Sequence, residues 1–166
     1  MTTLRLLFLA LLLPYCGWLV GAYEYHLLDN VNLAIHETGH LLFTPFGQTM
    51  HMLGGTIFQL LVPLVFAGHF LWKRRRFDAA ICGLWFAESL MYTAVYLGDA
   101  YLMQLPLVGG GTHDWNWLLS KVGLVHSCGT IAMVLHVIAC TLLAASFLAA
   151  GWVTLDERQP SPSGAS

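Results

Sequence analysis

Charged residues are scarce in this chain. They make up 10% of its 166 residues, whereas an ordinary soluble domain carries about 25%. With a net charge of −2 and no long basic run, the sequence offers no surface suited to nucleic acid. Hydrophobic residues reach 57%, which is the composition of an integral membrane protein.

Paired cysteines are also missing. No two cysteines form a CxxC pair, so the sequence contains no cysteine metal knuckle and no redox centre of that type. Each cysteine lies within an apolar run, and we expect four free, buried thiols: Cys16, Cys82, Cys128 and Cys140.

Long apolar runs dominate what is present. A helix needs roughly 20 apolar residues to cross the hydrocarbon core of a bilayer. The sequence therefore predicts an all-α integral membrane protein with about four transmembrane helices in a single membrane domain, residues 1–155. The expected spans are 6–22, 50–72, 77–98 and 118–150, the last within an over-long apolar run; an outer loop covers 99–117, and the Ser- and Pro-rich residues 156–166 are expected to be a disordered tail.

The first apolar run has two interpretations. Val20-Gly21-Ala22 resembles a signal-peptidase site, so residues 6–22 could be a cleaved signal. The run exceeds the usual length of a signal core, which favours a retained anchor.

The basic cluster Lys73–Arg76 sets the expected orientation. The positive-inside rule assigns it to the cytoplasm and the 99–117 loop to the outer side. Residues 31–44 are too short to span, and treating them as a span would place the basic cluster outside. We therefore expect a short re-entrant or interfacial helix that opens on the outer, periplasmic side of a bacterial inner membrane.

That short segment carries an HExxH motif, His36-Glu37-Thr38-Gly39-His40. On a helix, positions i and i+4 project from one face, so His36 and His40 could bind one metal ion. Glu37 lies beside them, where it could take a proton from water activated by the metal. Asn32, His36 and His40 form one polar row, which should face protein or trapped water because exposure of such a row to lipid is costly.

Other polar side chains could complete or support this site. The third span carries Glu88 and Asp99 on one face, with Asp99 at the outer end and Glu88 roughly 16 Å deeper. Three glycines, 109–111, precede His113 and Asp114, which could reach over the metal or orient the imidazole ligands. Gln59 could line a cavity and bind substrate, or serve in helix packing.

The motif resembles that of the integral membrane zinc metalloproteases, loosely the site-2-protease-like group and its small bacterial relatives. The resemblance covers the motif helix and the third span. It implies Zn²⁺ held by His36, His40 and an aspartate from a later span, for which Asp99 is the best match. Asp99 is followed by Ala where those proteases usually have Gly. Other membrane metalloproteases use a glutamate as the third ligand, which keeps Glu88 as an alternative.

The expected function is therefore a membrane-embedded zinc metallopeptidase that acts at or within the outer face of the membrane. Glu37 is the expected catalytic base, the metal ligands are His36, His40 and Asp99, and Gln59 is the expected substrate contact. Two alternatives stay open: a non-catalytic metal-binding membrane scaffold or assembly protein, and a zinc-dependent lipid amide hydrolase. The expected partners are membrane lipid and a membrane-protein or peptide substrate.

Overall fold

A computed structural model describes residues 2–108 and 111–157, and all regular structure within these ranges is helical. Four helices are long and apolar enough to cross a membrane. The predicted all-α membrane fold is confirmed. The four are α1 (Thr2–Gly21), α3 (Gln48–Trp72), α4 (Arg76–Gly98) and α6 (Cys128–Asp156), the last extended by the turn η3 (Val125–Ser127).

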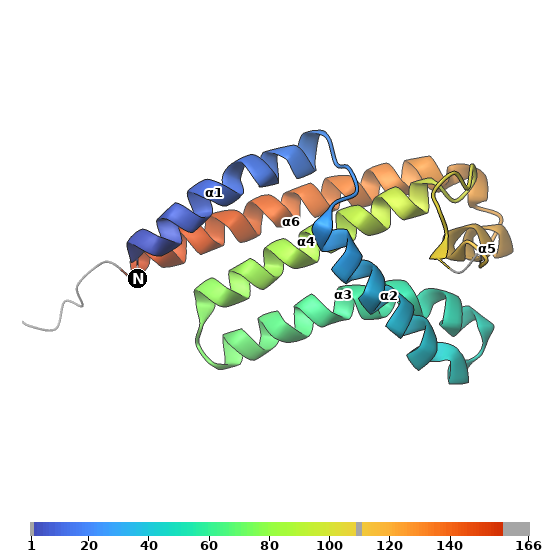
Figure 1. The fold of residues 1–166 in the computed structure, drawn as a ribbon, viewed down its shortest axis with the longest axis horizontal. Helices are drawn as coiled ribbons and strands as arrows, with labels where there is room; N and C mark the ends of the chain where they lie inside the picture. The colour runs from blue at the N-terminus through green and yellow to red at the C-terminus, as the bar shows by residue number, and fades with distance from the viewer. Residues whose placement is uncertain (1, 109–110, 158–166) are drawn as a thin grey trace, which may run out of the picture.

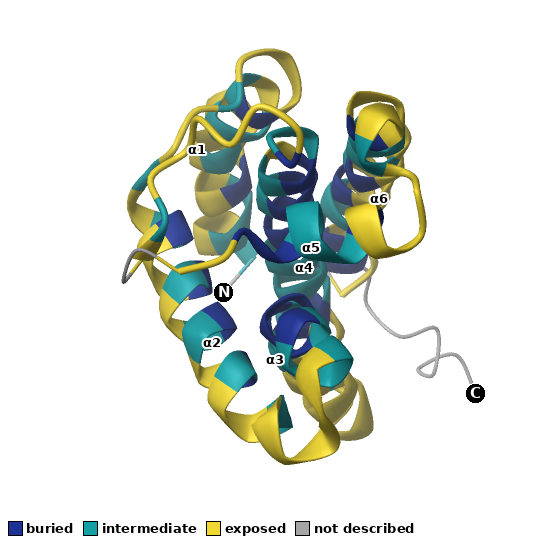
Figure 2. Ribbon diagram, turned by 90° about the vertical axis from the view of Figure 1, so that its right-hand side faces the viewer, coloured by how far each residue is buried: buried dark blue, intermediate teal, exposed yellow. Residues whose placement is uncertain are grey.

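Helix α4 occupies the centre of the bundle (Figure 1). It packs against α6 on one side and against α3 on the other, while α1 lies along α6. The central core joins α1, α4 and α6 through seven buried residues: Leu19, Leu84, Ala87, Leu90, Met91, Ala139 and Leu143. Figure 2 shows that buried residues concentrate on α4 and on the inward faces of its neighbours.

The outward faces of α1 and α6 expose large apolar side chains, including Leu11 and Met133. Such a surface is costly in water but is expected against lipid tails. The four cysteines are free, as expected. Cys128 is buried, as expected. The other three, Cys16, Cys82 and Cys140, are only half-buried.

The motif helix α2 (Leu27–Phe43) begins earlier than the expected residue 31. The carboxylate of Asp29 accepts a hydrogen bond from the backbone N–H of His26 at 2.9 Å, which stabilises the helix N-terminus. His26 is thus the N-cap of this helix. The chain then passes through the turn η1 (Thr44–Phe46) and Gly47, whose φ of +90° favours glycine.

Helix α2 packs closely on α3 because both have a glycine at the contact. A Cβ atom added at Gly39 would overlap the backbone carbonyl of Gly54, and one added at Gly54 would overlap the Phe43 side chain. Small residues allow this approach of two helix backbones. The contact fixes the HExxH helix against the N-terminal half of α3, which α2 crosses in Figure 1.

The fourth span differs from the prediction. The expected helix from residue 118 is interrupted: α5 (Asp114–Lys121) ends before Gly123, whose φ is +72°, and α6 begins only at Cys128. The positive φ at Gly123 reverses the chain, so α5 is a separate short helix across the end of the bundle. Of the tail expected to be disordered, Asp156 ends α6, and residues 158–166 lie outside the described residues.

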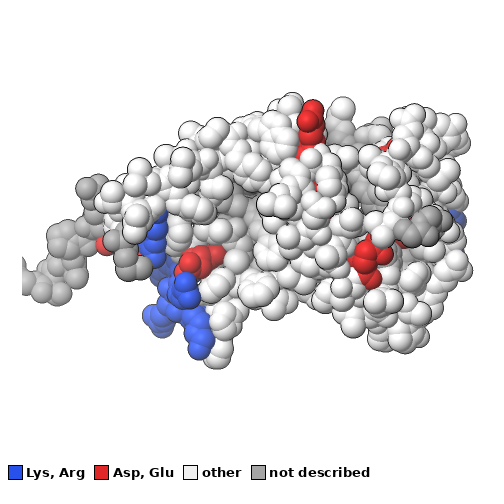
Figure 3. Space-filling model, in the orientation of Figure 1, with Lys and Arg blue, Asp and Glu red and all other residues white. Residues whose placement is uncertain are grey.

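Charged side chains lie mainly near the ends of the bundle. The Lys73–Arg76 cluster lies in the turn between α3 and α4, and Figure 3 shows it at the end where the chain begins. Arg5 is ion-paired with Glu157 at that end. The motif helix and α5 lie toward the other end (Figure 1).

Candidate metal centre

The two motif histidines converge on one carboxylate oxygen. The Nε2 atoms of His36 and His40 lie 3.0 Å and 3.2 Å from Oδ2 of Asp114. Asp114 is the first residue of α5, so the third side chain of the group comes from a different helix than the two histidines. Together the three side chains form a group that could hold a metal ion.

Gln59 on α3 fixes the orientation of His36. Its amide nitrogen donates to the carbonyl oxygen of Ser89 at 3.1 Å, so its Oε1 must face the His36 ring. The Nδ1 of His36 lies 3.1 Å from that Oε1 and donates to it. The Nε2 lone pair therefore points at Asp114. Gln59, the expected substrate contact, is buried and is not among the residues that line the cavity described below.

His40 is oriented in the same way by a backbone carbonyl. Its Nδ1 donates to the carbonyl oxygen of His51 at 2.7 Å, which leaves the Nε2 lone pair free to face Asp114. Ligating histidines commonly donate their other ring N–H to such an acceptor. Two nitrogen lone pairs and a carboxylate oxygen thus meet at one point. All three are acceptors, and only a cation, either a proton or a metal ion, satisfies them together.

The electrostatics of the metal-free site follow from these contacts. Burial by itself raises the pKa of the Asp114 carboxyl, but hydrogen bonds from His36 and His40, made when a ring also carries a proton on Nε2, outweigh it and lower that pKa to about 2. The hydrogen bond with Asp114 in turn raises the pKa of His40, and partial burial opposes this shift. The site therefore stabilises an ionised carboxylate beside two imidazoles.

Tyr96 on α4 positions Asp114. Its hydroxyl accepts the backbone N–H of Asp114 at 3.2 Å and donates to Oδ2 at 3.4 Å. Sequence reasoning missed this contact. The signal was available, because Tyr96 follows Glu88 and Tyr92 at four-residue intervals and so continues the same helix face.

The structure does not bring Asp99, the expected third ligand, to His36 and His40. Asp99 is the C-cap of α4, and its carboxylate accepts the backbone N–H groups of Gln104 and Leu105, each at 2.9 Å. It holds the start of the loop that leads to α5. The position expected for Asp99 is taken by Asp114, which the sequence offered only as a supporting or alternative ligand.

His113 also serves the loop and makes no contact with the motif histidines. It is the N-cap of α5, and its Nδ1 accepts the backbone N–H of Asn116 at 3.3 Å. Its ring stacks on Tyr96 with centroids 4.2 Å apart, and its Nε2 lies 3.7 Å from Asp99. Burial lowers the pKa of His113, and the neighbouring carboxylates only partly oppose this effect.

Glu88, the alternative third ligand, lies in a different cluster. The amide of Asn32 donates to both of its oxygens, at 3.2 Å and 2.9 Å. Glu88 is also 3.6 Å from His26. Asn32 thus begins the predicted polar row on α2 but faces Glu88, whereas His36 and His40 face Asp114.

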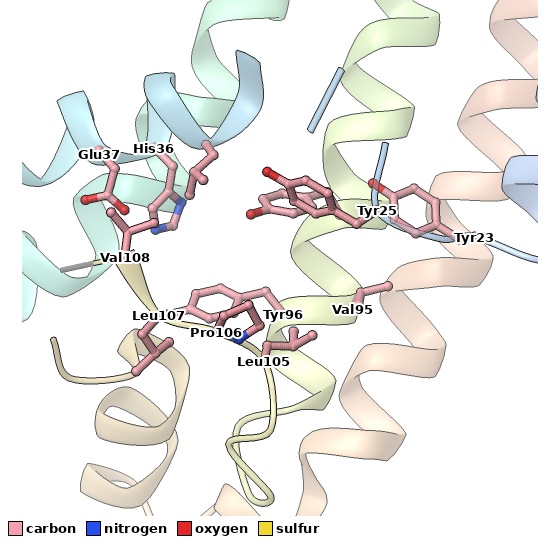
Figure 4. Close-up of a pocket in the computed structure, with 12 residues that line it drawn as sticks. Tyr23, Tyr25, His36, Glu37, Val95, Tyr96, Leu105, Pro106, Leu107 and Val108 are labelled. Carbon is pink, nitrogen blue, oxygen red and sulfur yellow. The ribbon is translucent and has the colours of Figure 1, made fainter. Parts of the chain in front are cut away.

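Glu37 borders a cavity of about 570 Å³ beside the motif histidines. Figure 4 shows His36 and Glu37 at one side of this cavity, with Tyr23 and Tyr25 away from them and Tyr96 below. The remaining wall is largely apolar and includes Leu33, Val95 and the loop residues 105–108. A carboxylate beside a pair of imidazoles therefore opens on a pocket of the size that holds small ligands.

Comparisons of the chain with models of known protein families, with curated proteins and with solved structures give no match. The chemistry of the site consequently rests on its own geometry.

Proposed function

We propose that this protein is a membrane-embedded zinc metallopeptidase that hydrolyses a peptide bond at the outer face of a bacterial inner membrane. One observation carries the proposal: the Nε2 lone pairs of His36 and His40 meet a carboxylate oxygen of Asp114 beside Glu37 and an apolar cavity. Two imidazoles and one carboxylate, with one position left open, are a usual ligand set for catalytic zinc.

Each residue has a distinct part in the proposed reaction. His36, His40 and Asp114 would hold the metal. Bound zinc would supply Lewis acidity and lower the pKa of water at the site. Glu37 would accept a proton from the attacking water and return it to the leaving amine. Gln59 and the His51 carbonyl would keep the ligating rings oriented.

The cavity supports an apolar substrate. Among the described residues that line the cavity, Glu37 is the only one with a carboxyl group, and none is Lys or Arg. A neutral apolar residue next to the scissile bond fits this wall better than an acidic one. The acyl chain of a lipid amide would also fit, so an assay should offer both an apolar membrane peptide and a lipid amide.

The positive-inside rule supports the proposed orientation. The Lys73–Arg76 cluster would face the cytoplasm, and α2 and α5 would then lie toward the outer side. Helix α2 has 17 residues and would lie at this end without crossing the membrane.

The test combines metal content with hydrolysis. His36→Ala, His40→Ala and Asp114→Asn should lose bound zinc, whereas Glu37→Gln should keep it and lose about 10²- to 10⁴-fold in turnover. Asp99→Asn is the matched control and should retain zinc, because the Asp99 carboxylate bonds to the loop backbone and pairs with neither His36 nor His40.

Two results would overturn the proposal. Normal zinc content in His40→Ala would show that His40 is not a metal ligand. Unchanged turnover in Glu37→Gln would show that Glu37 is not the catalytic base. If zinc is retained but neither substrate is cleaved, and Glu37→Gln supports full cellular function, the metal-binding scaffold is the better description.

A further inference from the structure

A second group of metal-ligand side chains lies between the start of α2 and the middle of α4. It consists of His26, Asp29 and Glu88, and one ligand atom of each lies within 4.8 Å of the other two. Asp29 has 0% and Glu88 1% of its surface exposed. The group shares no residue with the His36–His40–Asp114 centre.

The hydrogen bonds around the two carboxylates all run toward them. Asp29 accepts from the Tyr23 hydroxyl at 2.5 Å and from the backbone N–H of His26 at 2.9 Å. Glu88 accepts from the Asn32 amide and, at 3.3 Å, from the same Tyr23 hydroxyl. In each of these contacts a carboxylate oxygen faces a hydrogen-bond donor, and the single Tyr23 hydroxyl lies between the two carboxylates.

One imidazole ring is the nearest cationic group to these two carboxylates. Within the described parts of the chain, their only ion-pair partner is the His26 ring, whose Nδ1 lies 2.8 Å from Asp29 and whose Nε2 lies 3.6 Å from Glu88. Two buried carboxylates beside one imidazole are stabilised by a cation, either a proton or a metal ion, because buried charges are paired or bound to metal.

The His26 ring is oriented as a metal ligand. Its Nδ1 lies 2.8 Å from Oδ2 of Asp29 and 3.1 Å from the carbonyl oxygen of Glu24, both of which are acceptors, so Nδ1 carries the proton. Its Nε2 then faces Glu88 at 3.6 Å, which is too long for a hydrogen bond. Two ligands at about 2.0–2.2 Å from one tetrahedral metal are separated by about 3.3–3.6 Å. The distance between the Nε2 of His26 and the Glu88 carboxylate therefore matches that of two ligands on one metal ion.

We propose that His26, Asp29 and Glu88 bind a second divalent cation of the Zn²⁺ or Mn²⁺ type, which suits one imidazole and two carboxylates. The ion joins the α1–α2 turn to α4. Because Tyr23 contacts both carboxylates and also lines the cavity, the ion fixes that part of the cavity wall. Its binding moves the Tyr15 hydroxyl, now 2.6 Å from Nε2, off the His26 ring.

The experiment counts metal ions per chain. Purified protein is stripped with a chelator, titrated separately with Zn²⁺ and Mn²⁺, and analysed by mass spectrometry of the elements. We expect two ions in wild type and one each in Glu88→Gln and His40→Ala. Asp78→Asn, which changes an acid in the first turn of α4, is the control and should keep two.

The variants separate this inference from the proposed function. If Glu88→Gln loses an ion while His40→Ala does not, the second site stands and the zinc peptidase fails. Retention of the His40-dependent ion in Glu88→Gln shows that the variant is folded. Tyr15→Phe should keep two ions, because it removes only the hydroxyl that competes for Nε2.

A second measurement covers the case in which Glu88→Gln does not fold. In the His40→Ala background, Zn²⁺ or Mn²⁺ should raise the thermal unfolding temperature, and Asp29→Asn should abolish this rise. The inference is overturned if His40→Ala binds neither ion and shows no rise, which would mean that protons compensate the two carboxylates.

Discussion

Gln59 controls the proposed zinc site although it is not expected to touch the metal. It accepts the Nδ1 proton of His36 and is itself held by Ser89 and Thr93 on α4. The tautomer of a ligand on α2 is therefore set by two other helices. The Gln59 side chain thus makes the Nε2 lone pair of His36 available for a metal only while α3 and α4 are packed together.

Gln59→Leu should weaken zinc binding about 10- to 100-fold, since it removes the acceptor that orients His36. Affinity can be measured by competition with a chelator of known strength. Gln104→Leu is the control, because Gln104 is exposed and contributes only its backbone N–H to Asp99. Equal affinities in the two variants would contradict the role given to Gln59.

His113 should make stability depend on pH. Burial lowers its pKa below the ordinary value of 6.5, so the unfolded chain binds the proton more readily. Its contribution to stability is present above pH 6.5 and decreases as the pH falls below that value. In chelator-treated protein, the unfolding temperature of wild type should therefore fall more steeply on acidification than that of His113→Asn, which keeps a capping side chain. Parallel curves for the two proteins would contradict this assignment.

At the scale of the helices, the glycine contact between α2 and α3 decides where the motif lies. A Cβ added at Gly55 would overlap the Nε2 of His36, and one at Gly39 would overlap the α3 backbone. The two helices could not approach this closely with larger residues. The HExxH motif is therefore positioned by a feature of the neighbouring helix as well as by its own spacing.

Gly39→Ala should destabilise the protein by about 1–3 kcal/mol, because backbone atoms of α3 must move to admit the methyl group. Gly68→Ala is a matched control in α3, where an added Cβ meets nothing within 4 Å. It should be neutral or stabilise the helix by up to about 1 kcal/mol. Denaturant unfolding in detergent measures both, and an equal effect of the two substitutions would argue against the close contact.

At the scale of the whole molecule, the two ends of the bundle differ in charge and in chemistry. The turn between α3 and α4 carries four consecutive basic residues, Lys73–Arg76, whereas the motif helix and α5 lie toward the other end. A membrane crossed by the four long helices would thus separate the basic cluster from the proposed active site.

Cysteine labelling in spheroplasts tests this orientation. In a background without the four native cysteines, Leu102→Cys in the loop after α4 should react with a membrane-impermeant maleimide. Lys73→Cys, which is also exposed, should react only after the membrane is broken. The reverse pattern would place the active site in the cytoplasm.

Local properties of the sequence predicted the helices well. The length of an apolar run fixes whether it can cross a membrane, and a four-residue spacing places His36 and His40 on one helix face. The errors were at the ends of elements: the Asp29 interaction with His26 lengthened α2, and the positive φ at Gly123 separated α5 from α6. Both depend on the conformation of one or two residues.

The sequence by itself determined the class of fold, the HExxH pair and the polar row that begins at Asn32. Only the tertiary structure decided which carboxylate each member of that row meets. Asp99 caps a loop, Glu88 joins His26, and Asp114 reaches His36 and His40 from α5. Helix periodicity is a local property, whereas the third group of the site is set by the path of residues 99–113 and the packing of Tyr96, which bring together residues 78 positions apart.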